Sequence, residues 1–417
     1  MVGGQFVTER PVRGRVAGLD GLRGLAALYV MLFHSWLLAF QYFPRNTGPS
    51  YLTWAMYGRL SVVFFLALSG FSLALSPAAN QWRLGGVWRF LRRRAWRILP
   101  AYWAALAFSL AVAIFIVPAT HKGPPTHRSM AVFGLLLQDV VKARTPNGAF
   151  WSVAVEAELY LLFPLLLLFR RRLGAPVLLA AALLPAALYA VAAPHHNPPE
   201  GDTGLTLHLL PVFAAGLVAA AALTASTRIR AVPWHWLAAV AAAPVILLIH
   251  AKGSYWSGHH FFWIDLAITP SMIMLIVAVA TGRAAVLTRL LDTWPFRRLG
   301  TISYSLYLVH LPILTVLAKK VAPHHVGAHG PHTYAFVVLL GVPLSLLAAT
   351  IFANVFELPF QRHRSWRALL TAARRTLPAA RPALRRHPEP EAEPVAPPDS
   401  QQDPGRSGRD PEPARVG

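Results

Sequence analysis

Long apolar runs separated by short polar segments make up most of the chain between residues 18 and 356. Ten of these runs have the roughly 17 to 25 residues that a helix needs to cross a bilayer. They lie at 18–40, 57–75, 99–118, 151–169, 176–193, 205–223, 234–250, 262–281, 302–320 and 334–356. A further apolar stretch, 130–141, is too short to span and is expected to lie in a loop or to re-enter the membrane. The pattern predicts an all-α, polytopic membrane protein with about ten transmembrane helices.

Composition supports this class of protein. Of the 417 residues, 55% are hydrophobic and 13% are charged, whereas about 25% of the residues in a soluble domain are charged. The chain has no cysteine, which excludes disulfides and thiol chemistry. The first apolar run is longer than the roughly 7–15 residues of a signal peptide, and nine more runs follow it. We therefore interpret it as a true span.

Basic residues distinguish the two sides of the predicted membrane domain. The segments 83–97, 170–172 and 283–298 and the C-terminal tail hold most of the Lys and Arg residues. Because cytoplasmic loops carry an excess of these residues, we predict that these segments and both termini are cytoplasmic. The same bias accounts for the net charge of +22, so no nucleic-acid partner is predicted.

The end of the chain differs from the rest in composition. Residues 371–417 are rich in Ala, Pro and Arg and then become acidic, so they have little to bury. The sequence predicts a transmembrane domain over 1–370 and a disordered cytoplasmic tail over 371–417. The high Ala, Arg and Pro content also indicates a GC-rich bacterial genome, and thus a multi-pass protein of the bacterial inner membrane that contacts lipid.

The first apolar run contains polar residues. Arg23 and His34 are eleven residues apart, close to three helical turns, so they share one face about 16 Å apart along the axis. Asp20 lies one turn before Arg23. Charged and titratable groups are costly in hydrocarbon and usually mark a polar pathway. Alternatively, Arg23 extends to the membrane surface and His34 bonds to a backbone carbonyl.

The fourth run, WSVAVEAELYLLFP, places a carboxylate near the expected depth of His34. Glu156 and Tyr160 share a face as an i, i+4 pair, while Glu158 points the other way. A carboxylate beside an imidazole can orient it and raise its basicity, as in a general base. We therefore predict that Glu156 or Tyr160 orients His34. The alternative is that Glu156 pairs with an arginine for packing.

A dense group of arginines occupies the segment QWRLGGVWRFLRRRAWRILPAYW. Arg89, Arg93 and Arg97 share one helical stripe, and Arg94 lies one turn before Arg97. A guanidinium group can bind a phosphate through two parallel N–H···O hydrogen bonds. The spacing indicates a group suited to a polyanion, although ordinary anchoring at the cytoplasmic face would also explain it.

Histidines outside the first run are harder to interpret. His310 lies among tyrosines and serines in SYSLYLVHLPI and is as readily structural as functional. Other histidines lie in predicted outer loops without carboxylates or cysteines at metal-ligand spacing, so no metal is predicted. They are His195, His196, His259, His260, His324, His325, His329 and His332.

Six segments in series resemble the acyltransferase 3 family of integral membrane acyltransferases, over about residues 16–363. They are LDGLRGLAALYVMLFH, FFLALSGFSLAL, RRRAWRILPAYW, WSVAVEAELYLLFP, SYSLYLVHLPI and FELPF. The resemblance implies transfer of an acyl group, usually acetyl, from a cytoplasmic coenzyme A thioester to a hydroxyl. Acceptors in the family include surface polysaccharides, peptidoglycan, periplasmic glucans and macrolide antibiotics.

The resemblance also implies roles for individual residues. The paired Arg and His of the family's first helix match Arg23 and His34, its Arg-x-x-Arg element matches Arg94 and Arg97, and its fourth-helix glutamate matches Glu156. Family members often have two consecutive glutamates there, whereas this chain has Glu156-Ala157-Glu158. The resemblance leaves the second carboxylate without an expected role.

These observations give one mechanism and two alternatives. Four arginines would hold the phosphates of acetyl-CoA or another acyl-CoA: Arg93, Arg94, Arg97 and Arg23. His34 would act as a base on a carbohydrate hydroxyl or carry the acyl group itself. A proton-coupled transporter would use Glu156 and His34 as a proton relay, but no internal repeat is evident. A purely structural membrane protein would leave the polar stripe of the first run unexplained.

Overall fold

The computed structural model describes residues 16–118, 123–192, 206, 208–363, 365–369 and 371. The chain divides into two units, 1–369 and 370–417, and Thr371 is the described residue of the second. Apart from Thr371, the predicted disordered tail (371–417) therefore lies outside the described residues. The described part of the first unit forms helices and contains no strand, which confirms the all-α prediction.

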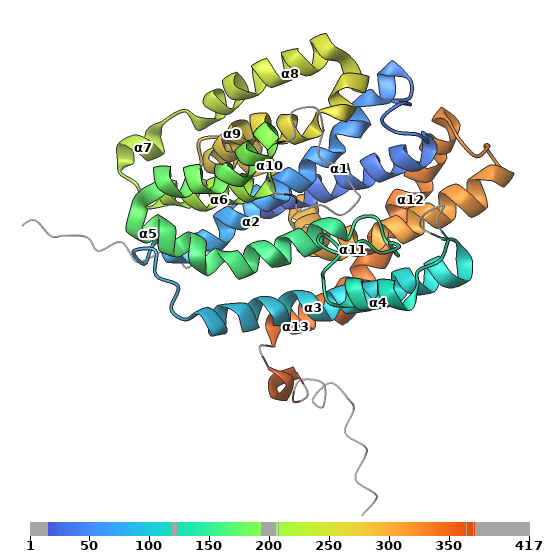
Figure 1. Ribbon diagram of the computed structural model, residues 1–417, viewed down its shortest axis with the longest axis horizontal. Helices are drawn as coiled ribbons and strands as arrows, with labels where there is room; N and C mark the ends of the chain where they lie inside the picture. Colours follow the sequence, from blue (N-terminus) through green and yellow to red (C-terminus); the bar gives the residue numbers. More distant parts are fainter. Residues whose placement is uncertain are drawn as a thin grey trace, which may run out of the picture. The chain divides into compact units, whose positions relative to one another are not determined.

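The described residues form a series of long helices (Figure 1). The α-helices are α1 (Leu19–Ala39), α2 (Leu60–Ala78), α3 (Val87–Ala111), α4 (His127–Gly134), α5 (Trp151–Ala192), α6 (Leu209–Ala219), α7 (Thr227–Ala231), α8 (Trp234–His259), α9 (Phe261–Ala280), α10 (Ala285–Leu291), α11 (Trp294–Val316), α12 (Pro331–Phe352) and α13 (Leu358–Arg362). Shorter 3-10 and π turns are η1 (Ser50–Arg59), η2 (Val112–Ile116), η3 (Ala220–Leu223), η4 (Leu317–Val321), η5 (Ala322–His324) and η6 (Ala353–Glu357).

Every predicted span overlaps a helix, but the helices begin and end at other residues than the spans do. Within the described residues, eight helical stretches are long and apolar enough to cross a membrane. One of them, α5, has 42 residues and would be about 63 Å long if straight, twice the hydrocarbon thickness. Gly174, at φ 90°, breaks it between the predicted spans 151–169 and 176–193. The number of crossings and the cytoplasmic placement of the termini stay predictions.

Two apolar segments form helices shorter than these eight. The span predicted at 205–223 corresponds to the short apolar helix Leu209–Leu223, formed by α6 and η3. The stretch 130–141 contains the end of the eight-residue helix α4 followed by turns. At about 1.5 Å per residue this helix is too short to cross a bilayer.

Helix α1 packs along α11 over much of its length. Glycines make this close approach possible: a Cβ atom on Gly24 would lie 2.7 Å from the backbone nitrogen of Gly300, and one on Gly300 would lie 2.0 Å from the carbonyl oxygen of Asp20. Small residues allow membrane helices to bring their backbones together. The positions of side chains on α1 relative to those on α11 are therefore fixed by backbone contact.

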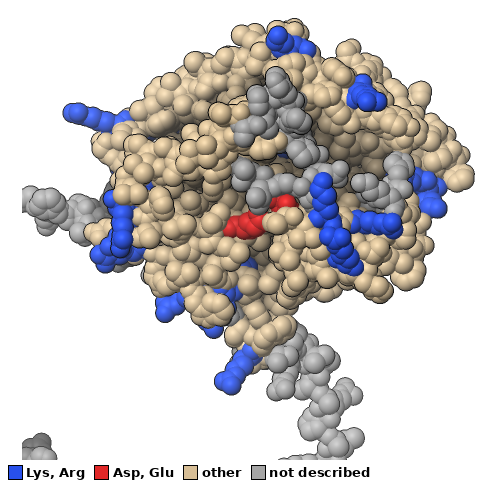
Figure 2. Space-filling model, viewed as in Figure 1, with Lys and Arg blue, Asp and Glu red and all other residues tan. Residues whose placement is uncertain are grey.

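Helices α2 and α6 also pack closely through glycines. A Cβ atom on Gly70 would lie 2.1 Å from the carbonyl oxygen of Phe213, and one on Gly216 would lie 2.0 Å from that of Ala67. The hydrophobic core runs through α1, α2, α6 and α11. On the face shown in Figure 2, acidic side chains are visible at one place near the middle and most of the surface is uncharged, as a lipid-facing surface requires.

Candidate active site

Helix α1 carries the two polar residues that the sequence singled out. Arg23 lies near its start, with Nη1 2.9 Å from Oδ1 of Asp20. His34 follows eleven residues later, about 16 Å along the axis, and is 8% exposed. Each residue belongs to a separate group of polar side chains.

The first group, which we name the arginine site, consists of Arg23, Arg94, Arg97, Glu156 and Tyr160. Arg23 interacts electrostatically with Arg97, Tyr160 and Glu156. Arg94 interacts with Tyr160, Arg97 and Glu156. Helices α1, α3 and α5 thus bring three guanidinium groups together beside one carboxylate, and positive charge is in excess.

The carboxylate of the arginine site is held by two hydroxyl groups. Oε1 of Glu156 accepts a hydrogen bond from Oη of Tyr160 at 2.5 Å and another from Oγ of Ser69 at 3.0 Å. Ser69 comes from α2, and its Oγ is 3.2 Å from Oη of Tyr160. A carboxylate away from water needs such partners. The three residues therefore form a fixed acceptor next to the arginines.

Arg94 is the half-buried arginine of α3. Its Cζ atom lies 5.6 Å from the ring centroid of Phe90 and 5.9 Å from that of Tyr160, distances at which cation–π attraction operates. Its buried Nε finds no acceptor in the part of the chain that the structure describes. Arg93 and Arg97 are exposed. Free guanidinium donors beside one another are suited to the oxygens of a phosphate group.

The second group is the histidine pair, His34 and His310. Nδ1 of His34 is 2.9 Å from Nε2 of His310 on α11, and the ring centroids are 4.9 Å apart. The hydrogen bonds of Glu156 run instead to Tyr160 and Ser69. The structure therefore brings Glu156 and Tyr160 to the arginines and places His310 beside His34.

His34 lines a cavity of about 200 Å³. The π turn η2 supplies Ala113 to its wall, the segment before α5 supplies Asn147, and α11 supplies Leu311 and Thr315. Single π turns within helices often occur at functional sites. The imidazole of His34 thus borders a space large enough for a small reacting group.

The cavity adjoins a wider hollow of about 710 Å³. Both are lined by Leu37, Leu38 and Val117. The wider hollow also has polar side chains in its wall, among them Gln41 and Lys319. Gln41 lies beyond His34 in the sequence, at the end of α1 opposite Arg23, and Lys319 lies beyond His310 in η4. The wider hollow therefore lies toward that end of α1.

Hydrogen bonds hold the cavity wall. Nδ2 of Asn147 donates to Oγ of Ser109, at 3.2 Å, and to the carbonyl oxygen of Leu308, at 3.1 Å. Oη of Tyr307 lies 2.5 Å from Oγ of Ser152. These contacts tie α3, α5 and α11 together around the segment before α5.

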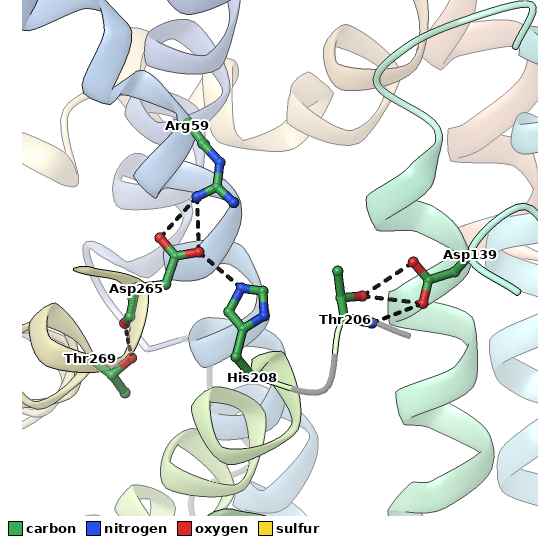
Figure 3. Close-up of polar contacts among 6 residues, drawn as sticks. All are labelled: Arg59, Asp139, Thr206, His208, Asp265 and Thr269. Atoms are coloured by element: carbon green, nitrogen blue, oxygen red, sulfur yellow. Dashed lines mark hydrogen bonds and ion pairs between the residues drawn. The ribbon is translucent and has the colours of Figure 1, made fainter. Parts of the chain in front are cut away.

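A further polar network lies outside both groups (Figure 3). Both carboxylate oxygens of Asp265 accept from Nη1 of Arg59, at 3.1 and 2.9 Å, and Oδ2 is 3.1 Å from Nε2 of His208. The guanidinium of Arg59 also lies 4.5 Å from the ring centroid of Phe261. Asp265 is 1% exposed, so this network joins α9 to the last residue of η1, Arg59, and to the residue before α6, His208, in the interior.

Asp139 lies on the other side of the same region (Figure 3). Its carboxylate accepts from the backbone nitrogen and the hydroxyl of Thr206, at 3.2 to 3.3 Å. Burial raises the pKa of the Asp139 carboxyl, and the hydrogen bonds from Thr206 oppose that shift. Asp139 also interacts electrostatically with Glu158, which gives that glutamate a neighbour outside the arginine site.

Sequence reasoning did not identify several of these contacts. Asp265 was recognisable as a carboxylate within a predicted span, but Arg59 and His208 gave no sign that they are its partners. Ser69 lies in the segment FFLALSGFSLAL, which gives no sign that it is a partner of Glu156. The signal for His310 was a histidine inside a span, which is costly to bury without a partner.

Comparison with known sequences identifies the family. A family model described as an acyltransferase domain, Acyl_transf_3, matches residues 16–352. The chain belongs to the acyltransferase 3 family. This confirms the resemblance drawn from the six segments and the assignment as a polytopic membrane protein.

Curated relatives are also similar to this chain. The "Putative peptidoglycan O-acetyltransferase YrhL" of Bacillus subtilis is 26% identical over 334 residues, which cover 72% of this chain and 49% of the relative. The O-acetyltransferase OatA of Staphylococcus aureus is 24% identical, covering 83% and 57%. The peptidoglycan O-acetyltransferase OatA of Listeria monocytogenes is 25% identical, covering 74% and 51%. The chain thus matches about half the length of these relatives.

Proposed function

We propose that this protein is an O-acyltransferase that moves an acyl group, with acetyl as the expected group, from acyl-CoA to a hydroxyl of a cell-envelope glycan. One observation carries the proposal: α1 bears Arg23 in a cluster of guanidinium groups and, about three turns later, His34 at the wall of a cavity. The names of the relatives, which describe acetyl transfer to peptidoglycan, support the choice of acceptor.

The arginine site is proposed to hold the phosphate groups of the donor. Arg94 and Arg97 would bind phosphate oxygens, and Arg23 would add a third positive charge. Glu156 and Tyr160 would position Arg94, because the tyrosine ring lies against the guanidinium and its hydroxyl holds the carboxylate. Arg93, which is exposed beside Arg94, would add charge at the edge of this site.

His34 is proposed as the base. Its ring would take the proton from the acceptor hydroxyl while the oxygen attacks the thioester carbonyl carbon. A carbon–oxygen bond then forms, the carbon–sulfur bond breaks, and the departing thiolate of coenzyme A receives the proton from His34. General-base catalysis of this kind contributes about 10²–10⁴-fold to a rate.

The test uses purified protein in lipid nanodiscs with labelled acetyl-CoA and solubilised peptidoglycan fragments. We expect the wild type to bind the donor and to release CoA when the acceptor is added. His34→Ala should bind the donor and lose turnover by about 10²-fold or more. Arg94→Ala with Arg97→Ala should weaken donor binding at least about tenfold, since each charged hydrogen bond contributes about 1.5–3 kcal/mol.

Matched controls are His332→Ala and Arg92→Ala, two exposed positions, and both should behave as wild type. Label that remains on the wild-type protein but not on His34→Ala would show that His34 carries the acyl group instead of acting as a base. Wild-type protein that neither binds nor consumes acetyl-CoA or longer acyl-CoA would overturn the proposal. Proton flux into liposomes without any acyl donor would then favour a transporter.

A further inference from the structure

His310 is a buried histidine with two hydrogen-bond partners. It is 1% exposed. Its Nδ1 lies 3.0 Å from the carbonyl oxygen of Leu306, one turn earlier on α11, and its Nε2 lies 2.9 Å from Nδ1 of His34. Both ring nitrogens of His310 therefore have a hydrogen-bond partner within the protein.

These two contacts determine where the protons lie. A carbonyl oxygen only accepts, so Nδ1 of His310 must carry the proton that it donates to Leu306. A neutral imidazole has one donor and one acceptor nitrogen, so Nε2 of His310 accepts. Nδ1 of His34 must then donate. In its neutral form, His34 is left with an unprotonated Nε2, which is the nitrogen required of a base.

We propose that His310 is a positioning residue that holds His34 in the Nδ1–H tautomer and so keeps its Nε2 free to act as the base. This proposal rests on the proposed function, in which His34 is the base. In the described residues His34 has no hydrogen bond to a carboxylate; its partners are the imidazole of His310 and the backbone of Val30, one turn earlier on α1.

The same hydrogen bond serves both states of His34. When His34 takes a proton on Nε2, its Nδ1–H still faces Nε2 of His310, and a hydrogen bond from a charged donor is stronger than a neutral one. His310 does not need to change its own protonation during this step. It would orient the ring before the reaction and stabilise the imidazolium that forms.

The backbone contact between α1 and α11 supports this arrangement. Gly24 and Gly300 allow the two helices to approach with no side chain between them. Around the pair, Tyr307 packs near His310 with ring centroids 5.9 Å apart, and Oη of Tyr307 donates to the carbonyl oxygen of Ala149. The partner of the His34 ring is thus set by the packing of two rigid helices.

The test separates the tautomer from the activity. Protein with ¹⁵N-labelled histidine in nanodiscs is studied by solid-state NMR, and the His34 signals are assigned by their loss in His34→Ala. The wild type should show Nδ1 protonated and Nε2 unprotonated in His34. The opposite tautomer would overturn the proposal whether or not acyl transfer is detected, while absence of transfer with the expected tautomer would count against the proposed function alone.

Two variants then test the role. In His310→Gln the amide oxygen can accept from Nδ1–H of His34, so this variant should keep the tautomer and stay within about tenfold of wild-type kcat. His310→Phe removes the imidazole acceptor and leaves Val30 as the partner of the His34 ring that the structure describes, so the Nδ1–H tautomer should lose population and kcat should fall roughly 10²-fold, with donor KM unchanged. Equal losses in the two variants, or an unchanged tautomer in His310→Phe, would contradict the positioning role.

Discussion

Glu156 and Glu158 are two residues apart on α5 but belong to different polar networks. Glu156 accepts hydrogen bonds from Tyr160 and Ser69 and faces the arginines. Glu158 interacts with Asp139 instead. The residue inserted between them, Ala157, places the second carboxylate on another side of the helix. The structure thus supplies a neighbour for the carboxylate that the family pattern left without a role.

The hydroxyl of Tyr160 is expected to matter for donor binding. Tyr160→Phe removes the hydroxyl that donates a hydrogen bond to Glu156. It keeps the ring that lies against the guanidinium of Arg94. Loss of a hydrogen bond to a charged group costs about 1.5–3 kcal/mol, so KM for acyl-CoA should rise about tenfold or more while kcat changes little. Steady-state kinetics would measure this. Tyr255→Phe, an exposed tyrosine, is the control, and a fall in kcat alone would contradict the assignment.

The cavity beside His34 can be filled from η2. Ala113 is 1% exposed and lines this cavity, so Ala113→Phe places a ring in the space proposed for the reacting groups. We expect turnover to fall by at least tenfold with donor binding retained, as measured by single-turnover assay and by equilibrium binding of acyl-CoA.

Ala111→Phe provides the comparison, because Ala111 is exposed two residues earlier, at the end of α3. It should retain wild-type turnover. Full activity of Ala113→Phe in a correctly folded protein would show that the cavity is not the reaction chamber.

The close contact between α1 and α11 should not tolerate a side chain at Gly300. Gly300→Ala puts a Cβ atom 2.0 Å from the carbonyl oxygen of Asp20, which forces the helices apart. Overpacking of this kind costs about 1–3 kcal/mol. Thermal unfolding in detergent should show the loss of stability, and turnover should fall because His34 and His310 separate. Gly134→Ala, where a Cβ atom meets nothing within 4 Å, should leave both properties unchanged.

The ion pair at Asp265 is expected to stabilise the fold without contributing to the chemistry. Asp265→Asn removes the negative charge from Arg59 and His208, and breaking a buried pair costs about 3–5 kcal/mol. The unfolding temperature should drop while the remaining folded protein keeps its donor affinity. Asp292→Asn, a half-buried position, should change the temperature little. An acyl-CoA affinity that falls with Asp265→Asn would place this network in the donor site.

The length of the apolar runs was sufficient to locate the membrane helices, because hydrocarbon thickness imposes it. The spacing of Arg23 and His34 also placed them on one face, since a single helix fixes their separation. Even the break in α5 was implied by two runs that flank Gly174. These features depend on residues close together in sequence.

The partners of His34 and Glu156 could not be predicted in this way. Both residues were assigned to similar depths, but depth along the membrane normal does not determine which helices are neighbours within the membrane plane. His310 is 276 residues from His34, and their contact depends on glycines at Gly24 and Gly300. Glu156 bonds to Ser69 of α2 and interacts electrostatically with Arg94 of α3 because of the way α5 packs, which no local pattern encodes.

The single helix that joins Arg23 to His34 has a consequence for the choice of donor. A regular helix is stiff, so the distance between the phosphate-binding end and the base cannot adjust to the substrate. A donor can react only if the arm between its phosphates and its thioester has the matching length. Inserting or deleting one helical turn between these two residues would change which carriers the protein accepts, before any side chain in either site is altered.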